Sequence, residues 1–203
     1  MLAGVDGAGK SSIGGHLLQR AGLAWFNPDA FARELVAATG CEQTDANATA
    51  WHEGMRRLDD AIAHGTHYAF ETTLGGRTVP AKILAATGTH DVLMWFWGLA
   101  SPDRHIARVR ARVASGGHAI PDAKIRERYP AALEHLIALM PHLGRVQVYD
   151  NSVEVPVGGA VPDPVLVLDM MAGRIIRPTD LASLRRTPEW AKPVVEAALS
   201  RSA

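Results

Sequence analysis

The sequence contains only one cysteine, Cys41, so an intrachain disulfide is excluded. It also lacks a charge excess, because 21 lysines and arginines balance 21 aspartates and glutamates. A balanced charge gives no sign of the basic surface that nucleic-acid binding needs. No apolar run approaches the roughly 20 residues of a membrane-spanning helix, and no basic segment followed by an apolar stretch opens the chain. We therefore expect a cytoplasmic protein that binds neither nucleic acid nor membranes.

A glycine-rich segment at the start of the chain carries the strongest signal. Gly4-Val5-Asp6-Gly7-Ala8-Gly9-Lys10-Ser11 fits the phosphate-binding pattern G-x-x-x-x-G-K-[ST], the P-loop. In such a loop, backbone N–H groups surround a phosphate chain, and the positive end of the following helix points at the same anion. Lys10 would reach the β- and γ-phosphates, and the Ser11 hydroxyl would ligate Mg²⁺. The pattern predicts binding of ATP with Mg²⁺.

The spacing of apolar residues predicts a single domain over residues 1–203. Strands are expected at 2–4, 23–26, 67–71, 91–97 and 146–149, with a late hairpin at 165–170 and 174–176, a proline- and glycine-rich loop at 156–164 and a closing helix at 188–200. Alternation of strands and helices predicts an α/β fold. We expect a P-loop kinase-like three-layer α/β/α sandwich with a mainly parallel five-stranded sheet. Only three residues precede the P-loop, so the first strand is short or begins upstream.

Two polar segments follow predicted strands at the edge of the sheet where α/β folds bind ligands. Asp29 comes just after the second strand, where its carboxylate would accept a proton from a substrate hydroxyl. An N-cap for a helix over 30–38 is an equal alternative. Glu71 ends the third strand and is followed by Thr72 and Thr73. Glu71 would orient Mg²⁺ through water or bind the acceptor, and the alternative is a polar strand end with a flexible turn.

Arg104, Arg108 and Arg112 recur at every fourth residue of a helix that is expected to start at Ser101-Pro102. Like charges at this spacing destabilise an isolated helix by about 0.2–0.5 kcal/mol per pair, and a polyphosphate would offset that cost. A flexible Gly-Gly-His118 connection follows, and a second helix that Pro130 should kink or restart. We interpret residues from about 101 to 130 as a helical lid that closes on ATP. A solvated basic face is the alternative.

The predicted helix over 44–64 and the turn at 150–152 are weaker indications. Trp51, Met55, Leu58 and Ile62 lie within about 60° of one another on a helical wheel, which predicts that they face the core. Asn151 follows the fifth strand, where a P-loop kinase places a loop beside the adenine, although a plain β-turn is as reasonable.

Together, these segments resemble the zeta-toxin family of P-loop kinases, in particular its short, stand-alone bacterial members. The similarity runs through most of the chain and comprises residues 4–11, 27–31 (Asn-Pro-Asp-Ala-Phe), 71–77 (Glu-Thr-Thr-Leu-Gly-Gly-Arg), 108–113 (Arg-Val-Arg-Ala-Arg-Val), 116–121 (Gly-Gly-His-Ala-Ile-Pro) with Ile125, Arg128 and Tyr129, and 150–152 (Asp-Asn-Ser). The resemblance implies ATP- and Mg²⁺-dependent phosphorylation of UDP-N-acetylglucosamine on a sugar hydroxyl. It also implies a possible antitoxin partner, for which the sequence shows no interface.

By this resemblance Asp29 is the general base, Lys10 contacts the γ-phosphate, and Arg108 and Arg112 bind phosphate from the lid. Glu71, Thr72, Thr73 and Arg77 would face the acceptor together with Asp29, and Ser11 and Glu71 would serve Mg²⁺. The expected ATP contacts are Gly4, Asp6, Gly7, Ala8, Gly9, Lys10, Ser11, Ser12, Arg108, Arg112, His118, Arg128 and Asn151. Asp6 departs from the family, whose short members usually have asparagine there.

Two other functions stay open at this point. One is a P-loop kinase for a different hydroxyl, on another sugar, a nucleoside or an antibiotic. The other is an ATP-binding switch or toxin–antitoxin partner without turnover, because a P-loop and a basic lid suffice to bind ATP.

Overall fold

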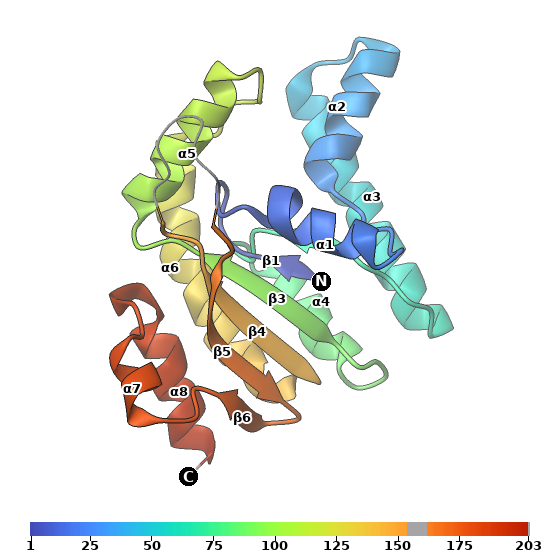
Figure 1. Ribbon diagram of the computed structural model, residues 1–203. Coiled ribbons are helices and arrows are strands. Elements are labelled where there is room, and N and C mark those ends of the chain that lie inside the picture. The colour runs from blue at the N-terminus through green and yellow to red at the C-terminus, as the bar shows by residue number, and fades with distance from the viewer. Residues whose placement is uncertain (154–161, 203) are drawn as a thin grey trace.

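A central sheet of six strands organises the computed structural model, which describes residues 1–153 and 162–202 (Figure 1). Its strand order is β2-β1-β3-β4-β5-β6. The strands are β1 (Leu2–Ala3), β2 (Glu71–Thr72), β3 (Leu93–Gly98), β4 (Arg145–Asp150), β5 (Val165–Met171) and β6 (Arg174–Arg177). The first four in this order are parallel; β5 pairs antiparallel with β4, and β6 pairs antiparallel with β5. The expected α/β fold with a mainly parallel sheet is confirmed.

The sheet has six strands instead of the expected five, and it differs from the expectation in three places. The strand expected at 67–71 is reduced to β2, which begins at Glu71 and includes Thr72. Residues 23–26 form no strand, because only Phe26 makes an isolated bridge, to Phe70. The late hairpin is part of the main sheet, since β5 pairs with β4 along its length. Of the loop expected at 156–164, residues 156–161 lie outside the described part of the chain.

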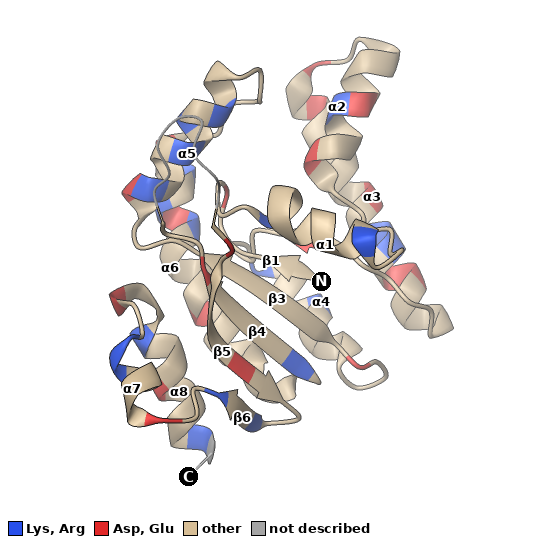
Figure 2. Ribbon diagram, viewed as in Figure 1, with Lys and Arg blue, Asp and Glu red and all other residues tan. Residues whose placement is uncertain are grey.

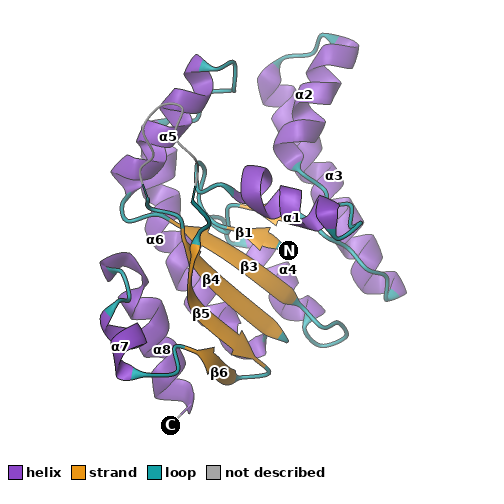
Figure 3. Cartoon of the chain, in the orientation of Figure 1, coloured by secondary structure: helices purple, strands orange, loops and turns teal. Residues whose placement is uncertain are grey.

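Helices connect the strands and cover both faces of the sheet (Figure 3). Their bounds are α1 (Gly15–Arg20), α2 (Pro28–Thr39), α3 (Gln43–His64), α4 (Thr78–Ala86), α5 (Pro102–Ala114), α6 (Asp122–Leu139), α7 (Leu181–Arg185) and α8 (Lys192–Ser202). A π-helical turn, Lys10–Gly14, leads from the P-loop into α1. None of these helices combines the length and apolarity that crossing a membrane requires, over the residues described.

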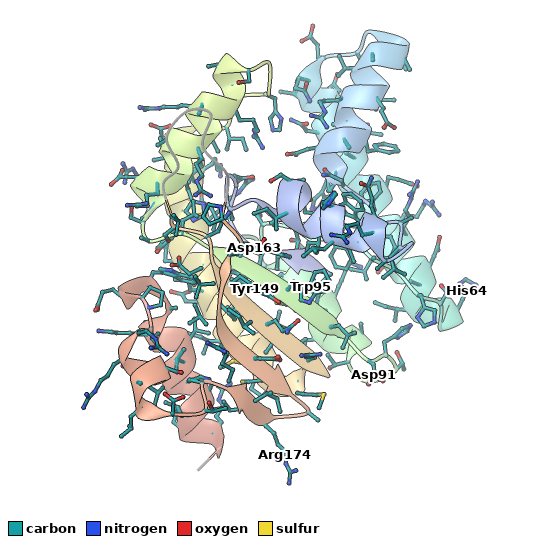
Figure 4. All side chains as sticks on the ribbon, in the orientation of Figure 1. His64, Asp91, Trp95, Tyr149, Asp163 and Arg174 are labelled. Carbon is teal, nitrogen blue, oxygen red and sulfur yellow. The ribbon has the colours of Figure 1, made fainter. Side chains whose placement is uncertain are left out.

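Alternate residues of β3 enter two different apolar clusters. Met94 and Phe96 join the main core, to which α6 contributes Leu136 and Leu139. Trp97 packs on the opposite face with Leu2 and Leu18, beneath α1. Figure 4 shows Trp95 and Tyr149 on this second face, where they lie against the same cluster.

Capping residues fix where α2 and α5 begin. The Asn27 side chain accepts the Ala30 N–H at 3.1 Å, so Asn27 is the N-cap of α2. Asp29 therefore does not cap this helix, and the capping alternative for it is wrong. Ser101 caps α5 by accepting the Arg104 N–H at 3.3 Å, as its sequence predicts. Pro130 lies inside α6, which continues through it and is not restarted there.

Candidate active site

The P-loop connects β1 to the turn that begins α1, and its shape depends on close backbone contacts. Gly9 has φ +100°, and a Cβ there would lie 2.7 Å from Nδ2 of Asn151. That amide donates a hydrogen bond to the Ala8 carbonyl at 2.8 Å. The Lys10 ammonium is buried and donates to the Val5 carbonyl at 3.3 Å. The loop is thus held in a curled form with its lysine folded inward.

Glu71 is the centre of a polar cluster beside this loop. Parallel pairing of β2 with β1 places Glu71 opposite Leu2, one strand away from the start of the P-loop. The Ser11 hydroxyl donates to both Glu71 oxygens, at 2.9 and 2.8 Å. Asn27 donates its side-chain amide to Oε2 at 3.2 Å, and the Lys10 ammonium lies 3.7 Å from Oε1. The cluster joins both predicted Mg²⁺ residues.

The oxygens of this cluster are of the kind and number that bind Mg²⁺ in nucleotide sites. Mg²⁺ usually takes one or two protein oxygens and completes its shell with substrate phosphates and water. The Ser11 hydroxyl and the Glu71 carboxylate supply such oxygens. Within the described ranges, no group of three or more His, Cys, Asp or Glu side chains forms an all-protein metal site.

Asp29 faces the segment predicted as a lid rather than its own helix backbone. Its carboxylate lies 3.8 Å from the Arg112 guanidinium on α5 and 3.9 Å from Nε2 of His118. Arg112 also donates to the His118 carbonyl at 3.4 Å. The buried Arg112 Nε has no hydrogen-bond partner among the described residues. The segment predicted as a lid therefore meets α2 at Asp29, and one donor of Arg112 is unused.

Asp6 is paired with a second residue of this segment. Its carboxylate accepts a 2.7 Å hydrogen bond from Arg128 on α6. Burial alone would raise the pKa of Asp6, but the positive charges of Lys10 and Arg128 outweigh it and hold the pKa below its ordinary value. The carboxylate is therefore ionised beside the phosphate loop.

Figure 2 shows basic residues recurring along α5, and the three arginines of the stripe have different partners. Arg104 donates to the Ser152 carbonyl, and Arg108 donates to the carbonyls of Asn151 and Val153 at 2.7 and 3.2 Å. These two side chains hold the segment after β4, whose Asn151 in turn braces Ala8 of the P-loop. Arg112 alone of the three reaches Asp29.

A cavity of about 540 Å³ joins these groups. Predicted site residues on its wall are Asp6, Lys10, Asp29, Glu71, Thr72, Thr73, His118 and Arg128. Arg77 is exposed at the start of α4 and does not line it. The other predicted site residues that do not line it are Gly4, Gly7, Ala8, Gly9, Ser11, Ser12, Arg108, Arg112 and Asn151.

Sequence reasoning missed several wall residues, namely Asn47, Trp51, Lys124 and Glu127. Trp51 was expected in the core but is 45% exposed and borders the cavity. The buried positions of α3 are Ala46, Ala50, Gly54, Leu58 and Ala61. Four of these five residues are alanine or glycine, and this pattern is the sequence signal that would have placed Trp51 beside the core instead of in it.

Comparison with known proteins gives similarity in structure only. The sequence matches no protein-family model and no curated protein. A solved structure from the PezAT chromosomal toxin–antitoxin system of Streptococcus pneumoniae is similar with a TM-score of 0.56 and 14% identity, over 98% of this chain and 83% of that one. A candidate kinase from Chloroflexus aurantiacus has a TM-score of 0.49 and 17% identity, over 63% of this chain and 75% of that one. At such identities the first similarity establishes the fold, which is like that of P-loop kinases.

Proposed function

We propose that this protein is an ATP-dependent kinase that transfers the γ-phosphoryl group to a hydroxyl of a small molecule. The supporting observation is the position of Asp29. Its carboxylate borders the same cavity as Lys10 and Glu71 and lies within 4 Å of two lid side chains. A hydroxyl in this cavity would have a proton acceptor on one side and the phosphate loop on the other.

The positions of the side chains support the following roles. Lys10 and the backbone N–H groups of the P-loop would bind the β- and γ-phosphates. Magnesium, when held by Ser11 and Glu71 with the nucleotide, supplies charge neutralisation on the phosphate oxygens. Arg112 would turn from Asp29 to the γ-phosphoryl group, which would also give its buried Nε an acceptor.

Asp29 would then receive the proton of the acceptor hydroxyl. The hydroxyl oxygen forms a bond to the γ-phosphorus while the bond from that phosphorus to the bridging β-phosphate oxygen breaks. ADP leaves with the bonding electron pair, and the acceptor leaves as a phosphate ester. Because such transition states are loose, most of the rate would come from positioning and charge neutralisation.

The acceptor we propose to test first is UDP-N-acetylglucosamine. Its choice rests on the resemblance of residues 27–31, 71–77 and 116–121 to the zeta-toxin family. A cavity of about 540 Å³ lies within the usual range for small-molecule sites, about 300–1,000 Å³. Glu71, Thr72 and Thr73 would face the sugar, whereas Arg77 stays outside the cavity in this conformation.

The test is incubation with Mg-ATP and a panel of hydroxyl acceptors, followed by mass spectrometry for the gain of one phosphoryl group. The panel contains UDP-N-acetylglucosamine, simple sugars, nucleosides and aminoglycosides, with D29N as the matched control. Phosphorylation of UDP-N-acetylglucosamine would support the full proposal, and phosphorylation of another compound would keep the kinase and reject the substrate. Nucleotide binding without any transfer would favour a binding switch.

A protein partner is the second part of the proposal. The pneumococcal structure of similar fold belongs to a toxin–antitoxin system, and on that basis we propose an antitoxin for this chain. Expression of the wild type should arrest growth, and the variants K10A and D29N should not. Relief of the arrest by a small protein encoded beside the gene would identify the partner.

A further inference from the structure

The negative charge inside the P-loop requires an explanation, because Asp6 lies where a phosphate chain would bind. The residue is only 7% exposed, and burying a carboxylate is costly unless it is paired. Its partner is Arg128, 122 positions later in the chain, whose terminal nitrogen lies 2.7 Å from Oδ2. The pair joins the P-loop to α6 directly.

The turn after β2 is shaped to let Arg128 reach this position. A Cβ on Gly75 would lie 2.5 Å from Cγ and 2.7 Å from Cβ of Arg128. The stem of Arg128 therefore passes against the backbone of Gly75, and any larger residue there would displace it. The P-loop, this turn and α6 all line the same cavity, so Arg128 lies at the border between the phosphate loop and the acceptor side.

We propose that Asp6 is a positioning residue that holds Arg128 at this border, so that Arg128 serves the acceptor and not the nucleotide. A guanidinium has five N–H donors. Asp6 takes the only hydrogen bond that the Arg128 side chain makes with the described residues. Its other donors would bind an oxygen of the acceptor, and this half of the inference rests on the proposed kinase function. The half that concerns nucleotide binding does not.

Charge arithmetic gives an ordered expectation for nucleotide affinity. The Asp6–Arg128 pair carries no net charge. D6N leaves one positive charge, R128Q leaves one negative charge, and the double variant is neutral again. A unit charge on the order of 8 Å from the phosphates, at an effective dielectric constant near 20, changes affinity about tenfold or more. D6N should therefore bind nucleotide more tightly than the wild type, R128Q more weakly, and the double variant within about threefold of the wild type.

The experiment is calorimetric titration of these four proteins with Mg²⁺ and a non-hydrolysable ATP analogue, with steady-state kinetics on the identified acceptor. We expect the affinity order just given, together with an acceptor KM raised about tenfold in R128Q and in the double variant and a smaller change in kcat. R128Q leaves Asp6 buried without its partner and is the variant most at risk of misfolding. The double variant and R128K keep the test decisive. The acceptor KM of R128K should lie between those of R128Q and the wild type.

A second arginine pair provides the matched control. Arg126 on α6 donates to Asp103 on α5 at 2.6 Å, and both side chains are more than half exposed. D103N and R126Q should change neither nucleotide affinity nor acceptor KM.

Two results would overturn the inference. A double variant that binds nucleotide at least tenfold more weakly than the wild type would make Arg128 a nucleotide ligand, as the resemblance to the zeta-toxin family implies. An unchanged affinity in D6N would show that the carboxylate does not control the phosphate site. A wild type that binds the analogue and phosphorylates no acceptor would refute the kinase proposal, whereas the affinity order would still decide the role of Asp6.

Discussion

Acid should destabilise this protein through one buried imidazole, that of His105 on α5. The side chain is 1% exposed, and its Nδ1 lies 2.7 Å from the Asp6 carbonyl oxygen in the P-loop. Its Nε2 is buried without a hydrogen-bond partner among the described residues. Burial lowers the pKa of His105 to about 4, and Lys10 and Arg108 add to the effect. The neutral ring therefore donates Nδ1–H to the P-loop.

The size of the effect follows from the difference in pKa between the folded and unfolded states. An unfolded histidine has a pKa of 6.5, so the folded value of about 4 is lower by about 2.5 pH units. At about 1.36 kcal/mol per unit, the free energy of unfolding should fall by about 3 kcal/mol. Because the unfolded state binds the proton first, this stability is present above pH 6.5 and is lost as the pH falls towards 4.

Urea unfolding at several pH values between 7.5 and 4 would measure this loss. The wild type is compared with H105Q, whose amide can still donate to the Asp6 carbonyl, and with H16Q, which changes an exposed histidine. Over this range, we expect the free energy of unfolding of the wild type to fall by about 3 kcal/mol more than that of H105Q. H16Q should lose as much stability as the wild type. Parallel profiles for the wild type and H105Q would refute the argument.

Four further substitutions test the site and the sheet. D29N should lower kcat by about 10²–10⁴ with nucleotide affinity retained, whereas K10A should lower both, as kinetics and calorimetry would show. G9A places a Cβ 2.7 Å from the Asn151 amide at a φ of +100°, so nucleotide affinity should be lost and the free energy of unfolding reduced by about 1–3 kcal/mol. D169A removes a buried carboxylate that accepts two hydrogen bonds from Arg145, and urea unfolding should show a loss of about 1–3 kcal/mol.

The fold could be predicted because its signals are local. The P-loop pattern, the N-cap at Ser101 and the alternation of strands and helices each depend on residues close in sequence. The attachment of the late hairpin could not be predicted in the same way. Pairing of β5 with β4 joins segments that residues 151–164 separate in the sequence, and hydrophobic periodicity does not report which strands become neighbours.

The orientation of α3 shows why helical periodicity alone misplaced Trp51. The periodic apolar positions predict a stripe in which tryptophan faces the core. The contact is instead made by small residues, since a Cβ on Gly54 would lie 2.9 Å from the Phe26 ring. Close packing at Ala50 and Gly54 turns the helix so that Trp51 stands at the rim of the cavity. A search for large apolar residues overlooks an interface built on small ones.

The length of α5 explains why the arginines of the stripe have different partners. Residues spaced by eight positions lie about 12 Å apart along a helix, since each residue rises about 1.5 Å. Arg104 therefore contacts the segment after β4 while Arg112 reaches Asp29 on α2. The sequence predicts that the three arginines share one face of the helix. It does not predict their partners, because these depend on how the helix packs in the folded chain.

Under the proposed kinase function, the charges at the candidate site would link nucleotide binding to activation of Asp29 as a base. Without ligand, three cations face three carboxylates, in the pairs Lys10–Glu71 at 3.7 Å, Arg112–Asp29 at 3.8 Å and Arg128–Asp6 at 2.7 Å. The first two are longer than hydrogen bonds, so exchanging their carboxylates for phosphate oxygens gives up little. The third is a charge-assisted hydrogen bond to a buried carboxylate and should persist. A nucleotide would then draw Lys10 and Arg112 away and release Asp29 for the acceptor hydroxyl only once the phosphoryl donor is in place.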